Sequence, residues 1–134
     1  MSYTLILDQK RGYLHAQVTR TNSAETVRAY TQEIHDACVR DRCQAVLIEE
    51  NLAGPSLGLA AVFNIVAERS VEAARLRQRI AFVDTNPEHD LSRMEFAENV
   101  AVNRGANMRL CASVEAAERW LLAGSATAPE PDSG

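Results

Sequence analysis

Acidic and amide side chains, with one histidine, follow two short apolar runs near the middle of this chain. These side chains belong to Glu50, Asn51, Asp84, Asn86 and His89. If the two runs are neighbouring parallel strands, their carboxyl ends lie at one edge of a sheet, where ligands usually bind. Carboxylates beside a histidine at such an edge could bind a divalent cation, perform acid–base chemistry or contact a partner.

A structural interpretation of the same residues stays open. The helix dipole favours acidic residues in the first turn of a helix without any ligand, and Asn86 followed by Pro87 is a common helix start. The segment 54–58 has neither the lysine nor the spacing of a phosphate-binding loop. A nucleophile–histidine–acid triad is recognised by geometry rather than by chain order. We therefore predict no catalytic residue, no metal ion and no cofactor.

The turn at 54–58, with the sequence GPSLG, connects the first apolar run to an apolar helix predicted at about 56–75. This interpretation places Ser56 at the N-terminus of the helix. A phosphate there would meet free backbone amides and the positive end of the helix dipole, so Ser56 is a candidate for phosphorylation. Serine is also a favoured N-cap because its hydroxyl accepts a hydrogen bond from a backbone N–H, and that role needs no modification.

The composition fits one cytoplasmic domain. The chain of 134 residues has 14 Lys and Arg against 18 Asp and Glu, a formal net charge of -4, and 46% of its residues are apolar. This charge does not favour nucleic acid or anionic membranes as partners, and no window approaches the roughly 20 apolar residues of a membrane span. We expect a single domain at 1–123. The segment GSATAPEPDSG has no apolar anchor, so we expect a disordered tail at 124–134.

Hydrophobic periods along the chain alternate between those of strands and those of helices. Two β-prone runs flank Gly12 and should form an antiparallel hairpin. Later short apolar runs alternate with amphipathic segments, which favours a mostly parallel sheet and the order ββαβαβαβα. Strands are expected at 4–8, 13–19, 44–49, 79–83 and 108–111, and helices at 23–41, 56–75, 88–104 and from 113 onward.

The second predicted helix is apolar around most of its circumference, whereas an ordinary surface helix has one apolar stripe. Three explanations stay open: deep packing against the sheet, a subunit interface, and the wall of an apolar ligand cavity. We predict a homodimer that buries side chains from the set Leu59, Val62, Phe63 and Val66.

Several segments resemble a known family. The opening hairpin, the run AVLIEE, the segment GLAAVFNIV and the ending RMEFAENVAVNRGANMRLCASVEAAERWLL are similar to the STAS-like (SpoIIAA-like) group of small bacterial proteins, over about residues 3–123. That resemblance implies an α/β fold, with a five-stranded mixed sheet, an N-terminal hairpin and four helices, as in anti-sigma-factor antagonists. In those antagonists a serine that follows an aspartate at the start of the second helix is phosphorylated by a partner kinase, which switches off binding. Ser56 occupies the serine position here, and Pro55 stands where the aspartate would be.

The resemblance implies a non-enzymatic regulatory domain that binds a protein partner through the apolar helix and the turn around Ser56. The alternative is a module for a small-molecule or lipid-like ligand, or an enzyme, that uses the polar edge of the sheet. The lipid-carrying CRAL-TRIO domains, which are similar in fold, illustrate this alternative. A deep apolar cavity beside Phe63 would favour it.

Overall fold

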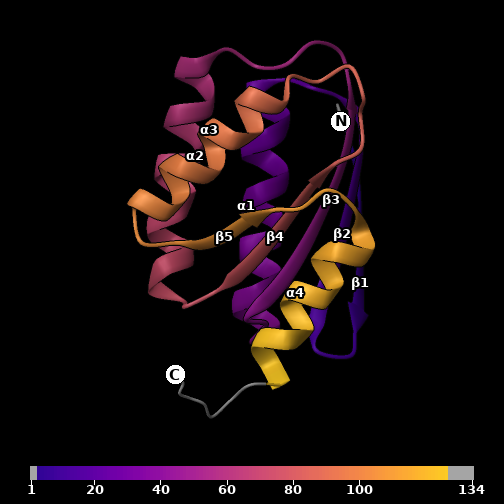
Figure 1. Cartoon of the computed structure of the whole chain (residues 1–134), viewed down its shortest axis with the longest axis vertical. Coiled ribbons are helices and arrows are strands. Elements are labelled where there is room, and N and C mark those ends of the chain that lie inside the picture. The colour runs from indigo at the N-terminus through magenta and orange to yellow at the C-terminus, as the bar shows by residue number, and fades with distance from the viewer. Residues whose placement is uncertain (1–2, 127–134) are drawn as a thin grey trace.

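The chain folds into five strands and four helices in the order ββαβαβαβα, as the sequence predicts (Figure 1). A computed structural model describes residues 3–126, so most of the predicted tail, 127–134, lies outside the described residues. The strands are β1 (Tyr3–Lys10), β2 (Tyr13–Thr21), β3 (Ala45–Ala53), β4 (Arg79–Asp84) and β5 (Asn107–Leu110). The helices are α1 (Ala24–Asp41), α2 (Leu59–Arg75), α3 (Leu91–Asn103) and α4 (Val114–Ala126).

The sheet is mixed, and its strand order follows the chain, β1-β2-β3-β4-β5. β1 and β2 pair antiparallel, and each later pair is parallel. Gly12 turns the hairpin at a φ of 91°, a conformation that suits glycine because it has no Cβ. Each parallel crossover moves one strand in the same direction, so its right-handed sense puts α1, α2 and α3 on one face of the sheet. α4 covers the other face (Figure 1).

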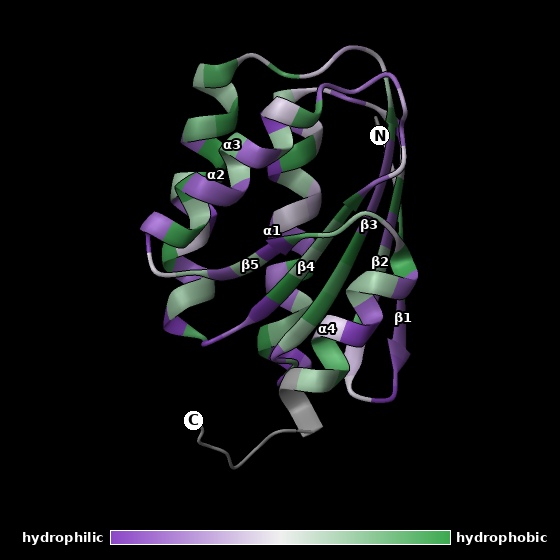
Figure 2. Ribbon diagram, viewed as in Figure 1, coloured by the Kyte–Doolittle hydropathy of each residue, from purple (hydrophilic) through white to green (hydrophobic). Residues whose placement is uncertain are grey.

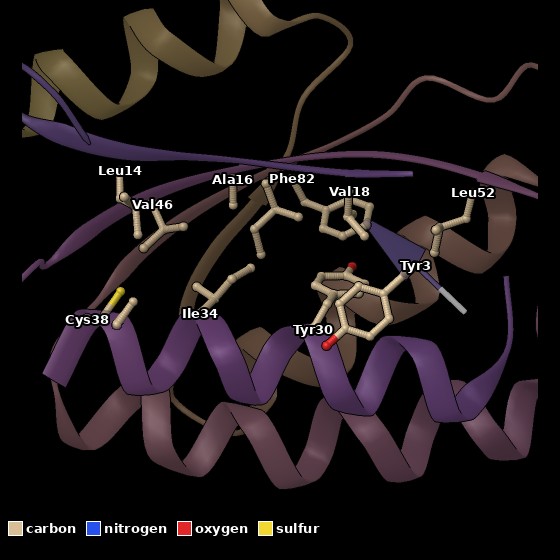
Figure 3. Close-up of a cluster of buried hydrophobic side chains, with 12 residues drawn as sticks. Tyr3, Leu14, Ala16, Val18, Tyr30, Ile34, Cys38, Val46, Leu52 and Phe82 are labelled. Atoms are coloured by element: carbon tan, nitrogen blue, oxygen red, sulfur yellow. The ribbon is translucent and has the colours of Figure 1, made fainter. Parts of the chain in front are cut away.

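Each face of the sheet has its own core, because side chains alternate along a strand. Val46 of β3 packs in one cluster with Tyr30 of α1 (Figure 3), and Ile48 of the same strand belongs to this cluster. Leu47 of the same strand points the other way and packs in a second cluster with Leu121 of α4. The central strands are therefore apolar on both faces, which appears as green along β3 and β4 in Figure 2. This confirms that the run after residue 44 is a strand buried on both faces.

Three helices begin later than the sequence predicts, because other residues cap them. Ser23 caps α1. Gly58 is the N-cap of α2, so Ser56 lies in the preceding turn and not in the helix. Asp90 caps α3 with its side chain, whereas the predicted cap Asn86 makes its hydrogen bonds in the turn before that helix.

Two elements also run further than predicted. β3 continues to Ala53 because its ladder with β2 extends to the pair Thr21 and Ala53. α4 continues to Ala126, so the predicted domain boundary at 123 falls inside a helix. None of the helices within residues 3–126 combines the length and the hydropathy that a bilayer crossing requires.

Candidate functional site

Glu50 on β3 and Asp84 on β4 are direct neighbours in the sheet, and both face the layer that contains α1, α2 and α3. Adjacent strands lie about 4.8 Å apart, so the two carboxyl groups share a small space. His89, from the turn before α3, reaches the same place. One nitrogen or oxygen atom from each of the three side chains lies within 4.8 Å of the others. With Asn86, whose Nδ2 lies 3.3 Å from Nε2 of His89, the structure brings together four of the five edge residues that the sequence singles out.

The ring of His89 is held from both sides. Nδ1 lies 2.7 Å from Oδ2 of Asp84, and Nε2 lies 2.9 Å from the carbonyl oxygen of Gly54. A carbonyl oxygen only accepts hydrogen bonds, so Nε2 carries a hydrogen, and an ionised Asp84 carboxylate is matched by a second hydrogen on Nδ1. Burial opposes the charge on this ring, but the hydrogen bond and charge of Asp84 and the bond to Gly54 raise the pKa of His89 above its usual value. His89 and Asp84 therefore form a buried pair that favours the charged form of the ring, and the two side chains are only 3% and 6% exposed.

Glu50 and Tyr30 form a second buried pair. Glu50 is 4% exposed and Tyr30 is fully buried, and the Tyr30 hydroxyl donates a hydrogen bond to Oε2 of Glu50. Burial raises the pKa of Glu50 to about 7, against the effect of the Tyr30 hydrogen bond; Asp84 adds to the rise and His89 opposes it. Burial, followed by the charge of Glu50, raises the pKa of Tyr30 well above its usual value. Glu50 therefore changes charge near neutral pH, whereas Tyr30 keeps its proton.

The hydrogen bonds of this cluster limit its chemistry. Glu50, Asp84 and His89 have the spacing of a metal site, but a metal ligand needs a neutral imidazole with a free lone pair. Both nitrogens of His89 are engaged, Nδ1 with Asp84 and Nε2 with the carbonyl oxygen of Gly54, so a metal ion or an incoming proton would have to displace one of these partners. The cluster is a buried, hydrogen-bonded group of two carboxyl groups, an imidazole ring and a phenol.

Of the two asparagines of the predicted edge, Asn86 lies beside the cluster, with its Nδ2 3.3 Å from Nε2 of His89, and Asn51 lies away from it. Asn86 donates from Nδ2 to the carbonyl oxygen of Leu52 at 2.8 Å, and its Oδ1 accepts from the N–H of Glu88 at 2.9 Å. It joins the end of β3 to the turn before α3. Asn51 is exposed and points to the opposite face from Glu50, because β3 continues through both residues and its side chains alternate. The prediction that Asn51 shares one edge with the others is therefore wrong.

The turn around Ser56 is fastened to three other parts of the chain. The N–H of Asp90 donates to Oγ of Ser56 at 2.8 Å. Two carbonyl groups of the turn accept hydrogen bonds, one from Nδ2 of Asn22 at 2.8 Å and one from Nε of Arg93 at 2.9 Å. Ser56 is half-buried. Its hydroxyl thus serves the start of α3 rather than α2, which differs from the N-cap role that the sequence suggests.

The four apolar residues predicted for a dimer interface lie on two sides of α2. Leu59 and Phe63 are 49% and 40% exposed, whereas Val62 is only 6% exposed. Val66 is half-buried and packs on the cluster of α2, α3 and β5 that contains Ala101. The structure corrects the prediction for Val62, which its own chain covers because that side of α2 faces the sheet.

The sequence does not predict two polar pairs that the structure shows. Tyr30 lies on the apolar stripe of α1, and only the fold shows that its hydroxyl meets Glu50. Nε2 of His15, on β2, lies 2.9 Å from Oε1 of Glu49. This pair is on the face of the sheet opposite Glu50. β2 and β3 pair so that His15 is level with Leu47, two residues before Glu49. The strand alternation was visible in the sequence, but the register between the two strands was not.

The fold as a whole is similar to a solved structure, the crystal structure of an anti-sigma factor antagonist from Mycobacterium paratuberculosis. The TM-score is 0.62 at 17% sequence identity, and the similarity covers 90% of this chain and 95% of the other. At this identity the likeness shows a shared fold, which confirms the STAS-like architecture expected from the sequence. No protein-family model and no curated protein matches the chain.

Proposed function

We propose that this chain is a non-enzymatic regulatory domain that binds a protein partner through the β3–α2 turn and the outer side of α2. The observation that carries the proposal is the similarity in fold to an anti-sigma factor antagonist over 90% of the chain. The contacts of His89 support the non-enzymatic part, because both ring nitrogens are occupied by partners within the chain, Asp84 and the carbonyl oxygen of Gly54.

The proposed binding surface consists of Ser56, Leu59 and Phe63 and is called the α2 surface below. Leu59 and Phe63 are four residues apart, so they lie on the same side of the helix. Nearly half of each side chain is exposed. An exposed aromatic ring beside an aliphatic side chain and a polar turn has the composition of a protein interface, in which apolar anchors are surrounded by polar groups.

We further propose that phosphorylation of Ser56 weakens partner binding. Oγ of Ser56 already accepts a hydrogen bond from the N–H of Asp90. A phosphoryl group on this oxygen brings a charge of about -1.5 to -2 next to the Asp90 carboxylate and the apolar Leu59. Like charges repel, and the added charge would lose water when a partner covers it. Ser56→Glu should therefore weaken binding, and Ser56→Ala should not.

We also propose that the chain forms a homodimer, and that its interface consists of contacts of Leu59 and Phe63. Light scattering of the wild type over a concentration series tests it. The dimer should dissociate in Phe63→Asp, and a wild type that stays monomeric throughout would remove the second copy as an occupant of this surface.

The partner is tested by affinity co-purification from the native host with mass spectrometry. The baits are the wild type, Phe63→Asp and the matched control Val39→Asp. Val39 lies on α1 and is 54% exposed. The Val39→Asp substitution therefore places the same charge at a comparable apolar position of another helix. We expect one protein to be retained by the wild type and Val39→Asp and lost with Phe63→Asp. If Phe63→Asp retains every protein that the wild type retains, the α2 surface is not the binding surface.

A further inference from the structure

An apolar cavity of about 150 Å³ lies between α2 and the sheet. Its apolar lining comes from all three helices on this face and from the central strands, and includes Ile34, Ile48, Val62, Ile65, Phe82 and Met94. The space stays open because short side chains stand where α2, α3 and β5 approach one another. These are Ala73, Ala97, Ala101 and Ala106. Phe63 is 40% exposed and does not line the cavity, so the cavity lies behind this helix rather than beside Phe63.

One end of the cavity is polar, and two carboxyl groups there share one histidine ring. Tyr30, Glu50, Asp84 and His89 all line this end. Asp84 is already paired with His89 at 2.7 Å. Glu50 accepts a hydrogen bond at Oε2 from Tyr30, and no residue within 3–126 donates to its Oε1. A buried carboxylate without a cation is costly, and a cation brought by a ligand would offset that cost.

The other charged groups along the cavity lie at the seam between α1 and α2, and they balance each other. Nη1 of Arg69 lies 3.0 Å from Oε1 of Glu72. The same guanidinium donates to Gln32 of α1 at 2.7 Å and to Thr31 of α1 at 3.2 Å. Arg69 thus ties α2 to α1 at the wall of the cavity. Glu50 and Asp84 thus share the single ring of His89, and that ring pairs directly with Asp84; among the described residues that line the cavity, none forms a direct ion pair with Glu50.

We propose that this cavity binds a small molecule with an apolar body and one protonated amine, and that the amine pairs with Glu50. Apolar cavities of about 150 Å³ admit molecules the size of benzene, so an amine with about six carbon atoms has a suitable size. A carboxylate headgroup would be repelled by Glu50 and Asp84, and an alcohol would leave the charge of Glu50 uncompensated. The proposal is independent of the protein partner discussed above. The wall of an apolar ligand cavity was one of the three explanations for the apolar second helix, and the proposal names a ligand for that cavity.

Three probes with the same six-carbon chain test the headgroup by isothermal titration calorimetry: hexylamine, hexanol and hexanoate. At about pH 8, roughly one unit above the pKa of Glu50, this carboxyl group is mostly ionised. We expect hexylamine to bind at least about tenfold more tightly than hexanol, and hexanoate to bind least. Equal affinities for the three probes, tighter binding of hexanoate, or no binding of hexylamine would each overturn the proposal. This comparison uses the wild-type protein alone, so it does not depend on a variant that folds.

Two variants locate the site. Glu50→Gln should lower the affinity for hexylamine at least about tenfold and leave that for hexanol unchanged. Ala73→Leu places a larger side chain in the cavity and should abolish binding of both probes. In NMR spectra, hexylamine should shift the amide signals of Glu50 and Ile65 and leave that of the exposed Val39 in place. Unchanged hexylamine binding by both variants, or amide shifts confined to the surface, would show that the amine binds elsewhere.

Discussion

Replacing Glu50 by glutamine should change how the stability of the chain depends on pH. Burial raises the pKa of Glu50 from 4.5 to about 7, so between these values the folded chain holds more protons than the unfolded chain. The free energy of unfolding therefore falls as pH rises through this window. At 1.36 kcal/mol for each pKa unit, the full loss is about 3 kcal/mol, and it stays constant at higher pH. Glutamine has nearly the same shape and no charge, so Glu50→Gln avoids this loss.

Urea-induced unfolding of the wild type and Glu50→Gln at a series of pH values measures the difference. The variant should gain on the wild type by about 3 kcal/mol from acid to alkaline pH. Its weaker hydrogen bond with Tyr30 does not depend on pH, so that bond lowers the whole curve of the variant and leaves the gain unchanged. Glu95→Gln removes an exposed carboxylate of α3 and is the matched control. If the wild type and Glu50→Gln give parallel curves, or the wild type gains stability as pH rises through the window, the argument from burial is refuted.

Three further predictions concern the surroundings of this cluster. Because the pKa of His89 is raised above 6.5 in the folded chain, the stability that its charge provides is complete below pH 6.5 and lost as pH rises through the folded-state value. The advantage of the wild type over His89→Gln in urea unfolding should therefore shrink with rising pH, and an advantage that grows would contradict the pairing with Asp84. Gly54→Ala, at a φ of 104°, should lower the free energy of unfolding by about 1 kcal/mol, whereas Gly58→Ala, at a φ of -67°, should change it little; thermal unfolding that shows equal effects would argue against strain at residue 54. Arg69→Ala should speed both entry and exit of hexylamine, since Arg69 joins α1 to α2 at the cavity wall, and exchange rates from NMR that match the wild type would place the entrance elsewhere.

The fold could be predicted from the sequence because its signals are local. Alternating strand and helix periods, the glycine of the hairpin and the apolar run after Gln44 give the element order and the doubly buried strand. Helix starts were less certain because several capping residues stand close together. Near α3, both Asn86 and Asp90 can begin a helix, and the choice depends on the carbonyl of Leu52, which the chain brings near only after folding.

The candidate site was predicted in part, for a similar reason. Glu50, Asp84 and His89 were expected together because they follow strands that pair in parallel. The length of β3 decided that Asn51 points to the other face, and this length depends on pairing with β2. Tyr30 could not be found from its own surroundings in α1, because a tyrosine on an apolar stripe gives no sign of a hydroxyl partner on another element.

The central claim, that a partner binds the α2 surface, is tested most directly by hydrogen–deuterium exchange of the chain with and without the partner retained in co-purification. Binding at this surface predicts slower exchange across the turn at 54–58 and the first turns of α2, with the β1–β2 hairpin unchanged. Slower exchange at the hairpin, with no change between residues 54 and 66, would contradict the claim.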